Sequence, residues 1–355
     1  MKPTPARMTV VASVVASCLA VVFVIGAPSA GADGVRPSNF SSVIDSVDPS
    51  PSTVQIEIVG GDSFLQVTAD PGTEVLVAGY DGEPYLRILA DGSVERNERS
   101  PATYLNISRS GDVDRFPAGV SGSAEPDWQN IGSDGRVAWH DHRIHWMLDD
   151  APAADQDGVV QAWTLPLQVD GEPVIVQGRL LIYPNVVPWA ALVAAAAALG
   201  AVVVSRRSKR RAPLLLGASV VALMLAVATF SINPPGAEPS QLPLILPALA
   251  AVLSAVATLA PTVAGVRSRT PRATHAVGLV LPLAAAAALI GWVIAQIGVV
   301  WMPTVPSAWA PWLTRAGAGM VLGIAVGVAI AVVSWPVLTG SDTTPSTRPT
   351  PPPAQ

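Results

Sequence analysis

The stretch VVQAWTLPLQVDGEPVIVQGRLLI, residues 159–182, decides the fold of the first half of the chain. Apolar and polar residues alternate along 159–169 and again along 174–182, and Asp170-Gly171 between them is a favoured two-residue turn. This pattern predicts a long β-hairpin. Further strand-like runs lie at 53–59, 64–68, 74–78 and 85–89. Because no useful helical period occurs before residue 185, we expect residues 33–185 to form an all-β, immunoglobulin-like sandwich with an irregular excursion over 97–135.

Charge and apolarity divide the chain into two halves. Residues 33–183 carry 24 acidic against 9 basic residues, whereas the chain from Pro184 onward carries 2 against 10. The acidic half would repel phosphates, which excludes a nucleic-acid partner for it. In the second half, five apolar stretches meet the length of about 20 residues that a bilayer core requires: Val186–Val204, Pro213–Ser231, Leu242–Ala264, His275–Gly298 and Leu313–Trp335. We therefore expect residues 186–335 to form an α-helical membrane bundle of five transmembrane helices in the lipid bilayer.

The basic loops orient this expected bundle. Residues 206–211 and 267–272 are rich in arginine, which predicts that both loops face the cytoplasm. Residues 33–185 then lie outside a plasma membrane, and residues 336–355 form a disordered, Pro/Thr-rich cytoplasmic tail. Glycines at 319, 323 and 327 repeat every fourth residue, a pattern of close helix packing. They predict packing within the bundle or a homo-oligomer formed through Gly319, Gly323 and Gly327.

The N-terminus has the features of an export signal. Lys2 and Arg7 precede an apolar run over 10–25, and Ala30-Gly31-Ala32 supplies small residues for cleavage, so we expect residues 1–32 to be a signal peptide. An uncleaved anchor and lipidation at Cys18 are the alternatives. Cys18 is the only cysteine of the chain. A cleaved chain therefore excludes disulfides, thiolate metal sites and cysteine nucleophiles.

Candidate metal ligands gather in the segment WHDHRIHWM, residues 139–147, which holds three of the four histidines. In a strand, His140 and His142 share one face, and His145 and Met147 form a second pair; a bend between them would unite the four. Imidazole suits Cu²⁺ and Zn²⁺, while a thioether favours Cu⁺, so copper is preferred to zinc. The predicted metal ligands are His140, His142, His145 and Met147, with Asp141, Asp149 or Asp150 as oxygen ligands or orienting groups.

Two other interpretations of this segment stay open. The histidines and Trp139, Trp146 and Met147 can belong to the surface and core of a sandwich without any ion. The imidazoles can also form a pH-responsive cluster. No nucleophile elbow and no general base with a partner is recognisable in residues 33–185, so we do not expect an enzyme.

The sequence thus predicts an integral membrane protein whose extracytoplasmic domain binds or handles copper. Its partner would be an envelope protein or a metal-handling protein. The alternative is a non-catalytic cell-envelope interaction or structural module with no metal.

Three stretches, residues 79–87, 97–106 and 139–147, resemble a group of actinobacterial membrane proteins of unassigned function that carry an exported β-rich domain. This resemblance implies the architecture and an envelope location, and no activity. The last hairpin, with Trp163 and residues 169–174, is faintly similar to copper-resistance β-sandwich domains. Those domains place a ligand histidine at the mature N-terminus, where this chain has Asp33.

Overall fold

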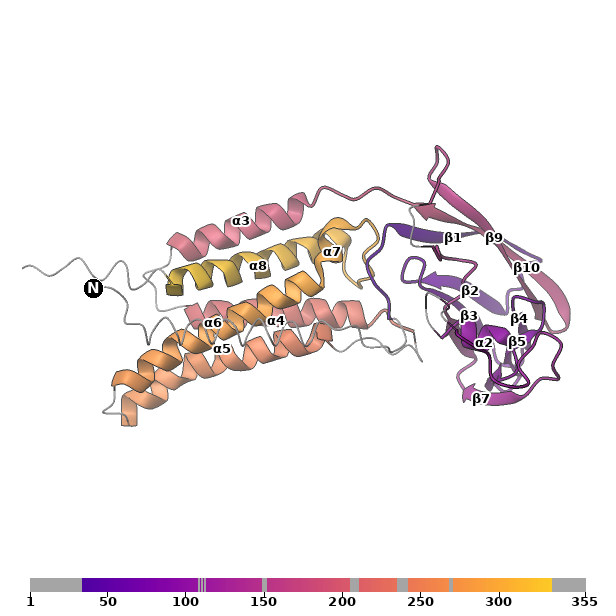
Figure 1. The fold of residues 1–355 in the computed structure, drawn as a ribbon, viewed down its shortest axis with the longest axis horizontal. Helices are drawn as coiled ribbons and strands as arrows, with labels where there is room; N and C mark the ends of the chain where they lie inside the picture. The colour runs from indigo at the N-terminus through magenta and orange to yellow at the C-terminus, as the bar shows by residue number, and fades with distance from the viewer. Residues whose placement is uncertain are drawn as a thin grey trace, which may run out of the picture.

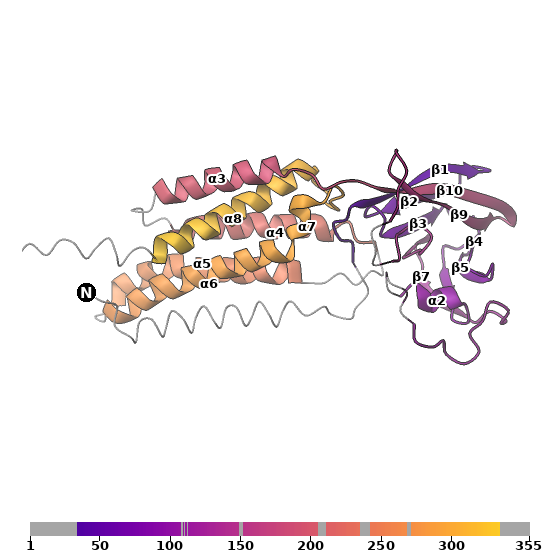
Figure 2. The same cartoon turned by 45° about the horizontal axis from the view of Figure 1, so that its top comes forward.

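The protein consists of a β-sheet domain followed by a helical region. The computed structural model describes residues 34–333 apart from 108, 110, 112, 149–151, 205–210, 235–241 and 268–270. The predicted signal peptide and cytoplasmic tail lie outside the described residues. Figure 1 shows the helices side by side along the long axis, with the strands gathered at one end, and Figure 2 shows the same arrangement after a turn of 45°.

The described strands form two antiparallel sheets. They are β1 Phe40–Asp48, β2 Val54–Val59, β3 Phe64–Ala69, β4 Val75–Ala78, β5 Pro84–Ile88, β6 Val94–Asn97, β7 Trp128–Gly132, β8 Arg136–Trp139, β9 Val159–Val169 and β10 Glu172–Ile182. One sheet has seven strands in the order β1-β10-β9-β4-β5-β6-β7, and the other has three in the order β2-β3-β8. The predicted hairpin is confirmed as β9 and β10. Asp170 and Gly171 have φ values of 50° and 82°, which the tight turn between two twisted strands requires.

A single apolar core lies between the two sheets. Alternate residues of β9 point inward, among them Leu165 at 0% and Leu167 at 2% exposure, and they pack with Leu65 and Val67 of β3. Gly178 on β10 leaves room for the Trp163 indole to pack against the backbone, because a Cβ at this position would lie 2.2 Å from the indole. The period of two seen in the sequence therefore arises from one buried face.

The predicted immunoglobulin-like sandwich is wrong. Such a sandwich divides about seven strands into groups of four and three, whereas here seven strands share one sheet and three form the other. Nor is the domain all β, because the helix α2, Pro101–Leu105, begins in the segment expected to be irregular. Ser100 caps this helix: its Oγ accepts a hydrogen bond from the Ala102 N–H, and Pro101 starts the first turn.

The helical region follows β10. Its helices are α3 Trp189–Val204, α4 Arg211–Phe230, α5 Leu242–Arg267, α6 Pro271–Ala295, α7 Ile297–Trp301 and α8 Pro311–Val333. The glycine face of α8 meets α3 of the same chain: a Cβ at Gly319 or Gly323 would lie 2.1 Å or 2.3 Å from a carbonyl oxygen of α3. An interface between two copies through these glycines stays a prediction.

The prediction of five transmembrane helices is also wrong. Within the described residues, two helices, α4 and α8, are long and apolar enough to cross a membrane. The other apolar helical segments, Trp189–Val204, Pro243–Leu259 and Leu279–Ala295, are shorter. Within the described residues, α4 and α8 are therefore the two helices that could cross a membrane.

Backbone contacts join the two parts. Ser38, just before β1, and Thr304, between α7 and α8, exchange two backbone hydrogen bonds of 3.1 Å. The Val35 N–H donates to Asn233 Oδ1 at 2.7 Å, and the Val186 N–H donates to the Trp301 carbonyl at 2.9 Å. The β domain is thus fastened to one end of the helices.

Candidate functional site

The histidine segment begins where β8 ends. The strand stops at Trp139, and residues 140–147 fold back in a turn in which the Ile144 N–H donates to the Asp141 carbonyl at 3.0 Å. The expectation that His140 and His142 share one face of a continuous strand is therefore wrong. The alternative of a bend is closer to the structure, because the turn folds residues 142 and 145 toward each other.

The carboxylate of Asp141 holds this turn together. It is fully buried and accepts hydrogen bonds from Trp139 Nε1 at 2.8 Å and from Arg143 Nε, Nη2 and N at 2.7, 2.6 and 3.0 Å. Burial raises the pKa of the Asp141 carboxyl, but the hydrogen bonds and charge of Arg143 outweigh it, and the net pKa lies below the usual value. Asp141 therefore serves as an anchor for the turn rather than as a metal ligand.

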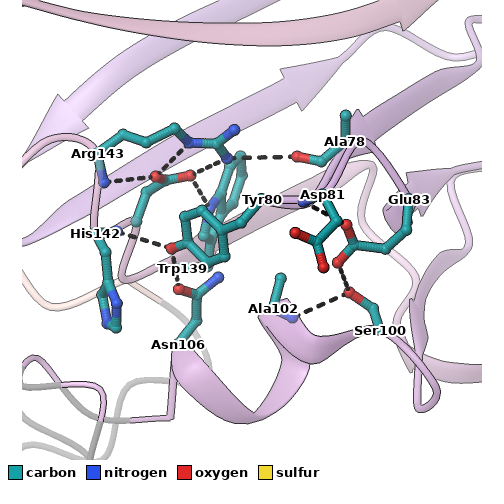
Figure 3. Close-up of polar contacts among 11 residues, drawn as sticks. Ala78, Tyr80, Asp81, Glu83, Ser100, Ala102, Asn106, Trp139, His142 and Arg143 are labelled. Carbon is teal, nitrogen blue, oxygen red and sulfur yellow. Dashed lines mark hydrogen bonds and ion pairs between the residues drawn. The ribbon is translucent and has the colours of Figure 1, made fainter. Parts of the chain in front are cut away.

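Tyr80 links the same turn to the end of α2. Its hydroxyl accepts the His142 N–H at 2.9 Å and donates to Asn106 Oδ1 at 2.5 Å, as Figure 3 shows. Its ring lies 5.0 Å from the Arg143 guanidinium and stacks on the His142 imidazole with ring centres 5.8 Å apart. Burial, followed by the charge of Asp141, raises the pKa of Tyr80 far above its ordinary value, so its hydroxyl stays protonated.

The three imidazole rings are not equally close to one another. The ring centres of His142 and His145 are 5.2 Å apart, whereas those of His140 and His145 are 6.5 Å apart. His140 stacks on Phe64 at 4.1 Å, and its Nδ1 lies 2.7 Å from the Ser63 carbonyl. A carbonyl oxygen only accepts hydrogen bonds, so Nδ1 is the protonated nitrogen of His140. His142 and His145 are thus the closer pair.

His145 has one nitrogen with a partner and one without. Its side chain is fully buried, and its Nε2 lies 2.8 Å from the Arg109 carbonyl, so Nε2 carries the proton. No donor in the described part of the chain reaches the buried Nδ1. Burial, followed by the charge of Arg109, lowers the pKa of His145 to about 3. At neutral pH the ring is therefore neutral, with a lone pair on Nδ1.

The side chains of Met147 and His142 both approach Gly111. A Cβ placed on Gly111 would be 2.4 Å from Cε1 of His142 and 3.3 Å from Cε of Met147. The thioether side chain and the imidazole therefore approach the same backbone position. Asp149 and Asp150, expected as oxygen ligands, lie outside the described residues.

The described residues contain no group of three or more histidine, cysteine, aspartate or glutamate side chains placed to hold a metal ion. What the turn brings together is two imidazoles and a nearby thioether, and the buried carboxylate of Asp141 is already paired with Arg143.

No protein family, curated protein or solved structure matches this chain. The likenesses to actinobacterial membrane proteins and to copper-resistance domains therefore stay predictions.

Sequence reasoning missed three residues of this site: Tyr80, Asn106 and Arg109. Tyr80 and Arg109 stand 62 and 36 residues from the histidines they contact. No local pattern marks such distant partners. The one available signal was Ser100-Pro101, a helix-start pattern that would have placed α2 and hence Asn106 at its end.

Proposed function

We propose that this chain is a membrane-anchored protein whose β domain binds a transition-metal ion, copper in preference to zinc, through His142, His145 and Met147. The observation that carries this proposal is the buried Nδ1 of His145, which no donor in the described residues satisfies. A buried polar atom left without a partner destabilises a protein by about 1–3 kcal/mol. A metal ion would use this lone pair.

The hydrogen bond on the other nitrogen supports the same proposal. Metal-binding histidines commonly donate their second N–H to a carbonyl or carboxylate, which sets the tautomer and the ring orientation. His145 donates its Nε2–H to the Arg109 carbonyl in this manner. With a pKa of about 3, His145 has no proton on Nδ1 to compete with an ion at neutral pH.

The spacing of the rings is compatible with a shared ion. Two imidazoles that bind one tetrahedral ion through nitrogen bonds of about 2.0 Å have ring centres roughly 5 Å apart. His142 and His145 have ring centres 5.2 Å apart. His140, at 6.5 Å from His145, supports the site by packing on Phe64. The Met147 thioether favours Cu⁺, which is why copper is preferred.

A copper titration tests this proposal. Purified full-length protein in detergent is titrated with Cu⁺ against a chromophoric chelator. We expect the wild type to bind one equivalent of Cu⁺. The affinity of His142→Gln and of Met147→Leu should be at least tenfold lower; Met147→Leu removes the sulfur but keeps a side chain of similar shape. His275→Gln, at the fourth histidine, is the control and should bind as the wild type does. Equal affinity of all four proteins, or no binding by the wild type, would contradict the proposal.

A second function is favoured by exposed apolar side chains of the β domain. Ile107, Phe116 and Leu148 are 57%, 36% and 65% exposed, in segments outside the strands. They suit a non-catalytic module that contacts another envelope protein. A partner captured by the full chain in the presence of a chelator, equally by wild type and His142→Gln but not by Leu148→Asp, would support this function over metal binding.

A further inference from the structure

One loop supports two of the three imidazoles of the candidate site. Gly60–Ser63 connects β2 to β3, and its Ser63 carbonyl lies 2.7 Å from His140 Nδ1. Asp62, fully buried, forms an ion pair with Arg109, whose backbone carbonyl accepts the His145 Nε2–H at 2.8 Å. The loop therefore holds His140 directly and His145 through Arg109.

The opposite side of the same loop rests on the linker between α7 and α8. Ser38 Oγ donates to Asp62 Oδ1 at 3.3 Å, and the backbone of Ser38 exchanges two hydrogen bonds with Thr304. The contact is tight, because a Cβ on Gly61 would lie 2.4 Å from Thr304 Cγ2. A shift of the loop toward the linker must therefore move Thr304 as well.

Beyond Thr304 the contacts reach α8. Arg315, in the second turn of α8, donates through Nη2 to the Met302 and Pro303 carbonyls at 2.8 and 3.2 Å. These two residues directly precede Thr304. An unbroken series of hydrogen bonds, an ion pair and chain neighbours thus runs from His145 to a helix that is long enough to cross a membrane.

We infer that the loop Gly60–Ser63 couples the candidate metal site to the helical region, so that a bound ion and the seating of the β domain on residues 302–304 strengthen each other. The inference rests on the proposed metal binding. An ion that fixes the His145 ring narrows the positions open to Arg109, and the buried ion pair passes this restriction to Asp62 and Ser38. Coupling between two sites is reciprocal, so disturbing the linker must weaken metal binding by the same factor.

Amide hydrogen exchange of the full chain in detergent, with and without one equivalent of Cu⁺, tests this inference. We expect copper to slow exchange at the Met302 and Thr304 amides by at least threefold in the wild type. Asp62→Asn removes the ion pair and should abolish this slowing while copper binds several-fold more weakly. Ser38→Ala keeps the ion pair between Asp62 and Arg109 but removes the hydrogen bond from Ser38 Oγ to Asp62. Copper should therefore slow exchange at Met302 and Thr304 less than it does in the wild type.

Asp45→Asn serves as the matched control, because Asp45 pairs with Arg179 at an exposed position on β1 and β10, outside this series of contacts. It should behave as the wild type in both measurements. Copper binding with unchanged exchange at Met302 and Thr304, or full slowing in both Asp62→Asn and Ser38→Ala, would overturn the coupling alone. Absence of copper binding by the wild type would instead overturn the proposed function, and the coupling with it.

Discussion

At the scale of single residues, Asp141 is the charge on which the histidine turn depends. Its buried carboxylate receives four hydrogen bonds from Trp139 and Arg143. Replacing one partner of a buried ion pair leaves the other charge uncompensated, which typically destabilises a protein by about 3–5 kcal/mol. Asp141→Asn should therefore lower the free energy of unfolding by about that amount, as measured by urea denaturation followed by tryptophan fluorescence. Asp45→Asn, at an exposed ion pair, should change it little.

His145 predicts a dependence of stability on pH. Its pKa is about 3 in the folded protein, whereas an unfolded histidine has its ordinary value of 6.5. Between these values the unfolded chain binds more protons, so the free energy of unfolding should fall as pH decreases from 6.5 toward 3. Above pH 6.5 this contribution is constant.

Urea denaturation of metal-free protein between pH 4 and pH 7 measures this effect. His145→Gln should show a shallower decline than the wild type, because its side chain does not titrate. His275→Gln should keep the wild-type slope. The lowered pKa of Asp141 adds a loss of stability in the same direction, below the ordinary carboxyl pKa of 3.8. An identical slope in His145→Gln and the wild type would contradict the lowered pKa of His145 in the folded protein.

At the scale of elements, α3 and α8 are held together by backbone contact along glycines. A Cβ at Gly323 would lie 2.3 Å from the Ala195 carbonyl, whereas a Cβ at Gly217 of α4 would meet nothing within 4 Å. Alanine favours a helix by about 1 kcal/mol over glycine. Gly217→Ala should therefore keep or raise the melting temperature, and Gly323→Ala should lower it because α3 must move away. A melting temperature unaffected by Gly323→Ala would show that the two helices do not pack closely.

The elements also show where local patterns succeed. The hairpin of β9 and β10 follows from its alternation and from a turn that accepts positive φ, both of which are local properties. After Trp139 the expected strand does not continue, because the Asp141 carboxylate accepts hydrogen bonds from the Arg143 backbone and side chain and the chain turns. A buried ion pair of this kind overrides strand propensity.

At the scale of the whole molecule, the arrangement supports a proposed orientation. Asn233, just after α4, contacts Val35 of the β domain, so Arg211 at the start of α4 lies at the far end of that helix. Basic residues favour the cytoplasmic side. We therefore propose that the β domain lies outside the cytoplasm, beside the outer ends of α4 and α8, with Arg211 at the cytoplasmic end of α4.

Reporter fusions test this orientation in cells. Alkaline phosphatase inserted after residue 185, which folds only after export, should be active. The same enzyme fused after residue 333 should be inactive, while a green fluorescent protein at that point should fluoresce. The opposite pattern would invert the orientation, and activity of both phosphatase fusions would contradict the cytoplasmic position of residue 333.

The sequence by itself determined the strands with a period of two, the Asp170-Gly171 turn, the apolar helices and the segment in which three histidines gather. These features depend on neighbours within a few residues. The tertiary structure alone decided that seven of the described strands share a sheet and that His142 and His145 approach each other. It also decided which nitrogen of His145 keeps its lone pair, because the carbonyl that takes the proton belongs to Arg109, 36 residues away. Burial and hydrogen bonding between distant segments set that nitrogen's chemistry, and no local pattern encodes them.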